Sequence, residues 1–115
     1  ELCEKNKQPE NDNQLIVRIQ TYIDEHYGDP SLCLSRISDL FHISESYFSF
    51  LFKKTVGVNF STYLEQVRMT QAKHLLETTN IKITDLYVAV GYNNLTSFRR
   101  AFKKKYGVAP NAIRE

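Results

Sequence analysis

The chain has 115 residues, 42% of them hydrophobic and 24% charged, with a formal net charge of +2. This composition is ordinary for a globular protein of one domain or two very small ones. No apolar run approaches the roughly 18 residues that cross a membrane, and nothing resembles a secretory signal. The first residue is glutamate, so we expect a segment of a longer protein whose upstream sensory or dimerisation domain is missing.

The charge is divided unevenly along the chain. Residues 1–45 hold nine acidic and four basic side chains, whereas residues 46–115 hold four acidic and eleven basic ones. A basic half fits a polyanion such as nucleic acid, although a solvated lysine face would give the same count. The only cysteines are Cys3 and Cys33. They favour reduced thiols, hence a cytoplasmic protein, over a structural disulfide.

The first third of the chain predicts a polar tail followed by two helices. Residues 1–12 are polar and read as a linker or tail. Helical spacing of apolar residues then predicts a first helix that Asn13 caps and Gly28 ends. A short second helix follows, with Cys33 at its start as a small filler residue. The apolar positions of these two helices are Leu15, Ile16, Ile19, Ile23, Tyr27, Leu34, Ile37, Leu40 and Phe41.

A tight turn at residues 42–44 and a helix over about 45–56 complete a first helix-turn-helix, about residues 34–56. Ser44 is the expected N-cap of its second helix. That helix has a partner fifty residues downstream: segment 48–58 reads FSFLFKKTVGV and segment 98–108 reads FRRAFKKKYGV. An internal repeat of this kind predicts that one structural element occurs twice. In each copy the apolar residues fall on one face, and Gly57 or Gly107 suits the left-handed position past the helix end. The predicted buried positions are Phe48, Leu51, Phe52 and Thr55 in the first copy, and Phe98, Ala101, Phe102 and Tyr106 in the second.

Between the copies we expect a linker helix over about 59–77, capped by Asn59 and roughly 27 Å long at 1.5 Å per residue. Its expected buried side is Phe60, Leu64, Val67, Ala72, Leu75 and Leu76. A second helix-turn-helix follows over about 83–106, with Gly91 at the turn where His42 stands in the first. Both turn positions suit a positive φ, which glycine adopts more easily than histidine. Pro110 suits the start of a last short helix. No segment alternates with a period of two, so the predicted fold is all-α, with about seven helices in two helix-turn-helix subdomains joined by the long helix.

A helix in the major groove needs short polar or basic side chains for base edges, and cations beside them for phosphates. Arg100 is expected to contact guanine, and Phe50, Leu95 and Thr96 to contact thymine methyl groups. Glu45 is a candidate acceptor for cytosine, and Phe50 has about even odds of being a half-buried packing residue instead. The expected base readers are Ser46, Ser49, Phe50, Leu95, Thr96 and Arg100. The expected backbone contacts are Ser44, Lys53, Lys54, Asn94, Arg99, Lys103 and Lys104.

These residues resemble a known family. The run from Gly91 to Lys104, GYNNLTSFRRAFKK, followed by Gly107-Val108-Ala109-Pro110 and Arg114, is similar to the C-terminal signature of AraC/XylS-type transcription regulators. The linker-helix pattern of Tyr63-Leu64, Arg68-Met69, Ala72 and Leu75-Leu76 is similar too. The resemblance covers about residues 14–114. Departures are Tyr87 where the family usually has alanine, Phe50 in place of a polar reader, and Ala109 in place of serine or threonine.

The resemblance implies a bacterial DNA-binding domain over residues 13–114, with two helix-turn-helix units in successive major grooves on one side of the duplex. It implies the same six base readers. RNA polymerase is expected as a further partner. The geometry agrees, because major grooves on one face recur every ~34 Å and the linker helix has the same order of length. Arg68 is expected to tie the linker helix to one unit through an ion pair with Asp39 or Asp85, rather than to bind phosphate.

Other classes fit less well. His26, His42 and His74 are scattered, without metal-ligand spacing or a nucleophile–base pairing near Cys33, so we expect no enzyme, no metal and no cofactor. The remaining alternative is a helical protein-interaction module that contacts RNA polymerase or a partner regulator. A steep fall of duplex affinity with salt would separate the two, because only a DNA reader releases counterions from phosphates.

Overall fold

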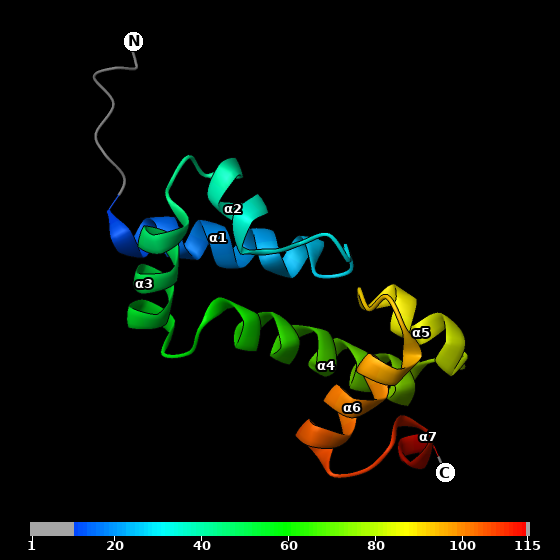
Figure 1. The fold of residues 1–115 in the computed structure, drawn as a ribbon. Coiled ribbons are helices and arrows are strands. Elements are labelled where there is room, and N and C mark those ends of the chain that lie inside the picture. Colours follow the sequence, from blue (N-terminus) through cyan, green and yellow to red (C-terminus); the bar gives the residue numbers. More distant parts are fainter. Residues whose placement is uncertain (1–10, 115) are drawn as a thin grey trace.

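The computed structural model describes residues 11–114; most of the expected tail, residues 1–10, and residue 115 lie outside this range. The described residues form helices without any strand, as predicted (Figure 1). The helices are α1 (Asp12–His26), α2 (Leu34–Leu40), α3 (Glu45–Val56), α4 (Phe60–Thr78), α5 (Ile83–Ala89), α6 (Leu95–Tyr106) and α7 (Pro110–Arg114).

The start of α1 differs from the prediction, because Asn11 and not Asn13 caps it. The Asn11 side chain accepts a hydrogen bond from the Gln14 backbone N–H at 2.8 Å, and the Gln14 side chain accepts one from the Asn11 N–H at 3.3 Å. This reciprocal capping box needs a glutamine or glutamate three residues after the cap. Asn11 has Gln14 at that spacing, whereas Asn13 has Ile16.

Two separate hydrophobic cores lie along the molecule, and α4 contributes to both. Its first residues, Phe60 and Leu64, belong to the first core, and Met69, Ala72 and Leu76 belong to the second. We call α1–α3 with the start of α4 the first unit, and the rest of α4 with α5–α7 the second unit. The other buried members are Ile16, Ile19, Ile23, Leu32, Ile37, Phe48, Leu51 and Phe52 in the first core, and Leu86, Val90, Phe98, Ala101 and Phe102 in the second.

The predicted apolar faces of the repeated helices are confirmed with one exception. Six of the eight predicted positions are buried, and Tyr106 is half-buried against the second core. Thr55 is exposed, as Lys105 is at the equivalent position of α6. In the last turn of α3 it is Val56 that packs against the core. In α4, Met69 is fully buried although it was not predicted to be, whereas Val67 and Leu75 are only partly buried.

The two helix-turn-helix turns begin alike, although the second has one more residue, Asn93, before the N-cap of the helix that follows. His42 and Gly91 both have positive φ, 58° and 94°. The next residue in each turn bonds back to the preceding helix: the Ile43 N–H donates to the Ser38 carbonyl at 3.0 Å, and the Tyr92 N–H to the Tyr87 carbonyl at 2.9 Å. The predicted repeat is therefore a structural one.

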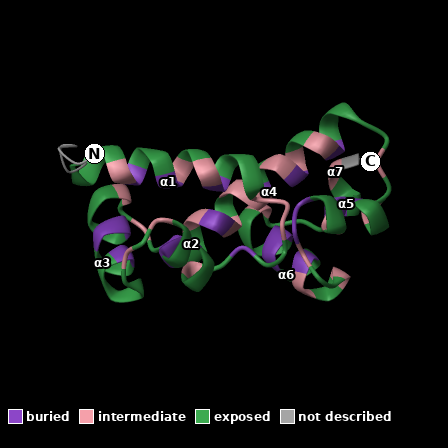
Figure 2. Cartoon of the chain, turned by 90° about the horizontal axis from the view of Figure 1, so that it is seen from above, coloured by how far each residue is buried: buried purple, intermediate pink, exposed green. Residues whose placement is uncertain are grey.

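The molecule is elongated, with extents of 57 × 24 × 21 Å. Seen from above, α1 and α4 follow one long edge, whereas α2, α3 and α6 lie along the other (Figure 2). The linker helix α4 has 19 residues, which corresponds to ~28 Å at 1.5 Å per residue. It therefore holds α3 and α6 apart along the molecule and on the same side of it.

Candidate nucleic-acid interface

The helices α3 and α6 are built alike, from cap to cap. Ser44 accepts a hydrogen bond from the Tyr47 N–H at 3.0 Å, and Asn94 accepts one from the Ser97 N–H at 2.8 Å. Both helices then run for 12 residues and end at a glycine in the left-handed region, Gly57 with φ 98° and Gly107 with φ 78°. The caps at Ser44, Gly57 and Gly107 confirm the prediction, whereas Asn94 was not predicted as a cap; together they fix each helix in the same register at an offset of fifty residues.

The predicted DNA-contacting residues lie on the exposed faces of these helices and at their N-caps. In the first unit, Ser44, Ser46, Ser49, Phe50, Lys53 and Lys54 are all exposed. In the second, Asn94, Thr96, Arg99, Arg100, Lys103 and Lys104 are exposed, and Leu95 is half-buried against the second core. The structure thus gathers these residues into two separate patches, one for each unit.

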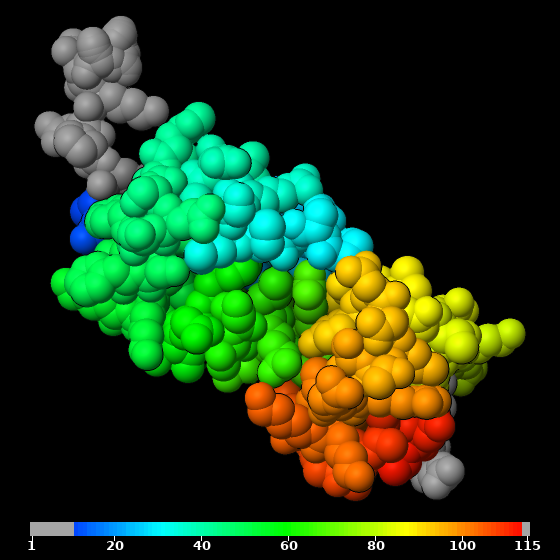
Figure 3. All heavy atoms as spheres, in the orientation of Figure 1, coloured from blue at the N-terminus to red at the C-terminus, as the bar shows by residue number. Residues whose placement is uncertain are grey.

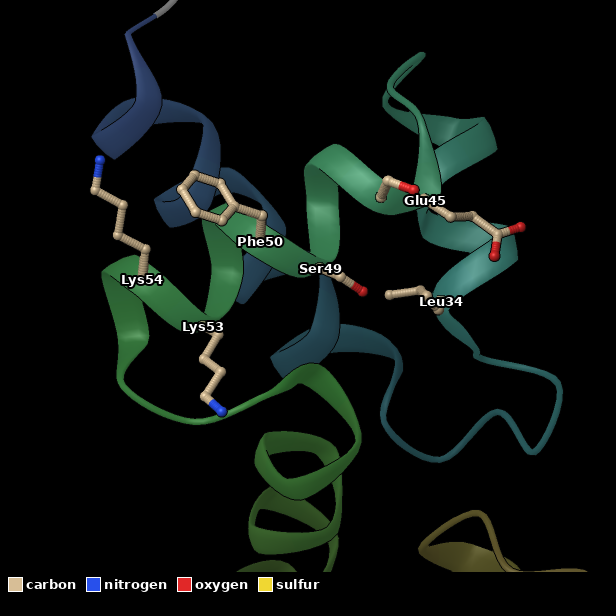
Figure 4. A pocket seen from close by; sticks show the side chains of 7 residues that line it. Leu34, Glu45, Ser49, Phe50, Lys53 and Lys54 are labelled. Atoms are coloured by element: carbon tan, nitrogen blue, oxygen red, sulfur yellow. The ribbon is translucent and has the colours of Figure 1, made fainter.

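The exposed face of α3 borders an open depression of 720 Å³. Across it, the Ser49 side chain points toward Leu34 at the start of α2, with Glu45 at one end and the two lysines of α3 at the other (Figure 4). Phe50 is 63% exposed and belongs to this surface. The alternative in which Phe50 is a half-buried packing residue is therefore wrong, because Phe50 is exposed and α3 turns its other side to the core. Leu34 was predicted only as an apolar helix position, and its place beside α3 follows from how the turn folds α2 against α3.

The two patches differ in charge, although their backbones match. At equivalent positions the first unit has Ser49 and Phe50, and the second has Arg99 and Arg100. Both patches end in lysines in the last helical turn, where cations complement the helix dipole. Within the part of the chain that the structure describes, Lys53, Arg99, Arg100, Lys103 and Lys104 make no ion pair. These cations are available to an anionic partner.

Arg68 lies on α4 between the two units, and its contacts differ from the prediction. Among the described residues its guanidinium binds carbonyl oxygens and not Asp39 or Asp85: Nε donates to Tyr27 O at 2.8 Å and Nη2 to Asp29 O at 3.0 Å. It also lies over the Tyr92 ring at 5.7 Å from the centroid. Burial lowers the pKa of the Arg68 guanidinium, opposed by Tyr92 and Asp29. An arginine remains charged under these conditions. Arg68 is therefore an internal contact and not a phosphate ligand.

Other kinds of site are not seen in the described range. Within residues 11–114 no three His, Cys, Asp or Glu side chains gather where they could share a metal ion. No helix in the same range is both long and apolar enough to cross a membrane. Cys33 is an exposed free thiol at the N-cap of α2 and makes no side-chain capping bond there.

Two helix-turn-helix units, each presenting its second helix on the same side of a connecting helix, define the class: a DNA-binding domain of a transcription regulator. The family described as "Helix-turn-helix domain" matches residues 37–115. Together with the relatives that follow, this match shows that the chain belongs to the AraC/XylS-type family of transcription regulators, and that it is the DNA-binding domain of such a protein.

Among curated proteins, the chain is similar to the bifunctional transcriptional activator/DNA repair enzyme AdaA of Bacillus subtilis (strain 168). The two are 33% identical over 113 residues, which covers 98% of this chain and 53% of AdaA. It is also similar to the arabinose operon regulatory protein of Escherichia coli (strain K12), with 31% identity over 114 residues, 99% of this chain and 39% of that protein. The chain therefore spans about half or less of the length of these relatives.

Among solved structures, the chain is similar to the C-terminal domain of the two-component response regulator yesN from Fusobacterium nucleatum. Here the TM-score is 0.84 and the identity 39%, over 92% of this chain and all of that one. The DNA-binding domain of the global transcriptional factor AdpA, solved in complex with a target DNA, shares the fold, with a TM-score of 0.82 at 21% identity over 86% of this chain and 88% of that one.

Proposed function

We propose that α3 and α6 enter successive major grooves on one face of a DNA duplex and read two half-sites. One observation carries the proposal: both helices expose their polar faces along the same edge of the molecule, held by one unbroken helix (Figure 2). Major grooves on one face of B-DNA recur every ~34 Å. A linker of ~28 Å gives the two reading helices a separation of this order.

Different chemistry in the two patches suggests different reading in the two grooves. In the second unit, we propose that Arg100 makes a bidentate contact with guanine while Leu95 and Thr96 contact thymine methyl groups. In the first unit, Ser46 and Ser49 are the polar readers, and Phe50 packs against a thymine methyl. Glu45 borders the same depression and can accept a hydrogen bond from cytosine.

The remaining residues of the two patches are proposed to hold the phosphate backbone. Ser44 and Asn94 use their side-chain oxygens to cap α3 and α6. The Ser44 O–H and the Asn94 amide N–H groups stay free to donate to a phosphate. The other backbone contacts are Lys53, Lys54, Arg99, Lys103 and Lys104. Because three of these five cations belong to α6, the second unit would supply more of the electrostatic affinity.

We further propose that residues 13–114 are the DNA-binding domain of a longer bacterial regulator that works in the cytoplasm. The relatives are two to three times as long as this chain, with 53% and 39% of their length covered. A sensory or dimerisation domain and a contact with RNA polymerase are expected outside the surfaces described above. The repair activity in the name of AdaA belongs to that protein; for the present segment we propose DNA binding without catalysis.

Selection of bound duplexes from a random pool, followed by footprinting, tests the proposal. We expect two short motifs whose centres lie about one helical turn apart, 10–10.5 base pairs, with protection on one face. A single short motif would mean that only one unit reads DNA. Failure to enrich any duplex would favour the alternative, a helical module that binds another protein.

A further inference from the structure

Besides their shared helix α4, the two units touch where the loop after α1 meets the end of α5 and the turn between α5 and α6. Figure 1 shows the loop approaching the turn, and Figure 3 shows atoms of the two segments in contact. The Tyr27 side chain packs against both hydrophobic cores. This contact lies beside the linker helix, within reach of Arg68. We call it the joint.

Arg68 closes the joint from α4. Its guanidinium donates to two carbonyl oxygens of the first unit, those of Tyr27 and Asp29, while it lies over the Tyr92 ring of the second unit. A planar guanidinium can bind two acceptors and stack on an aromatic ring at the same time, which a lysine ammonium cannot do. One side chain therefore connects the linker helix with both units.

Glycines allow the close approach on each side of the joint. A Cβ atom on Gly91 would lie 2.6 Å from Tyr27 O and 2.8 Å from Arg68 Nε, and one on Gly28 would lie 2.8 Å from Ala89 O. The equivalent turn of the first unit has the same positive φ but carries His42, which is exposed. Positive φ alone therefore does not require glycine at this turn. Gly91 is needed because the second turn, unlike the first, is pressed against the other unit.

The loop that supplies the carbonyl groups is itself held in shape. The Asp29 carboxylate accepts hydrogen bonds from the Ser31 N–H at 2.9 Å and from the Ser31 hydroxyl at 2.7 Å, and it pairs with Arg36 at 3.5 Å. The Asp29 N–H and carbonyl also bond within the loop, to His26 and Leu32. These bonds hold the loop in the shape in which its carbonyl groups point at Arg68, so the loop does not have to rearrange for Arg68 to bind it.

We infer that the joint of Arg68, residues 27–29 and Gly91 fixes the angle between α3 and α6, and thereby sets the half-site spacing that this domain accepts. Arg68 is a positioning residue, since it lies away from the two patches and acts on DNA recognition only through the placement of the units. The inference rests on the proposed function, because it concerns simultaneous reading by both units. An unsupported linker helix can bend and twist. Because the joint supports α4 at its middle, α3 and α6 keep one fixed position relative to each other on the duplex.

Two variants loosen the joint in different ways. Arg68→Met keeps a long apolar stem in a helix but removes both hydrogen bonds and the cation. Gly28→Ala adds a Cβ atom for which the Ala89 carbonyl leaves no room. The backbone of Gly28 does not have a positive φ, so alanine causes no backbone strain there and the variant tests the contact alone. Lys73→Met is the matched control, since it removes one cation from the same helix at a side chain 40% exposed and outside the joint. Circular dichroism and thermal melting establish that each variant is folded.

The probes are a duplex that the wild-type chain selects from a random pool, the same duplex with either half-site scrambled, and versions with one base pair inserted or removed between the half-sites. We expect both joint variants to bind the full duplex about tenfold more weakly, with less than a twofold change on half-site duplexes, because only the coupling between the units is lost. One inserted base pair turns a half-site by about 35°. The wild type and Lys73→Met should bind this duplex much more weakly than the full duplex. The joint variants should show a much smaller drop in affinity between their full duplex and this one.

Equal losses on full and half-site duplexes would overturn the inference, because a residue that only stabilises the fold weakens both alike. An unchanged affinity for the full duplex and an unchanged spacing preference would overturn it too. If the wild type binds each half-site as tightly as the full site, or selects no duplex, the proposed function itself has failed. These results differ from those expected if only the inference about the joint is wrong. In that case the wild type still prefers the full site over a half-site, and the joint variants show the same preference to the same degree.

Discussion

The salt dependence of duplex binding follows from the cations on α3 and α6. Five exposed side chains are proposed to bind phosphates: Lys53, Lys54, Arg99, Lys103 and Lys104. Each neutralised phosphate contributes about −0.9 to the slope of log K against log salt, so five predict a slope of about −4.5. Raising the salt from 50 to 200 mM should then weaken binding about 500-fold, or roughly 3.7 kcal/mol.

Removing two of these cations gives the matched comparison. In the double variant Lys53→Ala, Lys54→Ala the slope should fall to about −2.7, so that the same change of salt weakens binding only about 40-fold. Both lysines are exposed at the end of α3, so the fold should be unaffected. Fluorescence anisotropy titrations of a labelled duplex at four salt concentrations measure both slopes. A wild-type slope between zero and −1 would refute the reasoning, since a module that binds protein has no counterions of DNA to release.

Three further predictions concern single residues. Arg100→Ala should lose discrimination at one base pair by roughly 1–3 kcal/mol, whereas Lys103→Ala should weaken all duplexes alike; titrations against a set of single-base variants tell these apart, and no change for Arg100→Ala would remove it from the readers. Phe50→Ala should leave the melting temperature within about 2 °C but reduce affinity for the selected duplex by about 1 kcal/mol, because the ring is exposed until DNA covers it; a lower melting temperature with unchanged affinity would show a packing role. Phe98→Ala empties a fully buried position and should lower the free energy of unfolding by about 3–5 kcal/mol in a urea titration; a loss below about 1 kcal/mol would contradict its place at the centre of the second core.

Most of the fold was predictable because helix caps and helix ends depend on residues close to one another in the sequence. The caps at Ser44 and Asn59 and the glycine ends of α3 and α6 are set by hydrogen bonds within three or four residues and by local φ. The fifty-residue repeat then supplied the architecture. The exposed patches followed as well, because a helix whose apolar face is known has only one face left for function.

The joint could not be predicted, since its hydrogen-bond acceptors are backbone carbonyl groups. Every residue carries a carbonyl, so nothing in the sequence distinguishes Tyr27 and Asp29 as partners of Arg68 across about forty positions. Acidic side chains are the partners that a sequence suggests for an arginine, and the predicted ones, Asp39 and Asp85, are not those that Arg68 contacts. Glycine at position 91 was explained by its turn alone, and its second reason, contact with the other unit, became visible only in three dimensions. Met69 was missed in the same way, because it is buried where α4 passes from one core to the other.

The division of α4 between two cores has a consequence for how the molecule comes apart. Each half of this helix is about ten residues long, and helices of that length are marginal in water without a packed side. If one core opens, its half of α4 frays, and fraying that reaches the middle of the helix removes the support on which Arg68 depends. An opening at one end of the protein is therefore transmitted to the other through α4, besides the contact that Tyr27 makes with both cores.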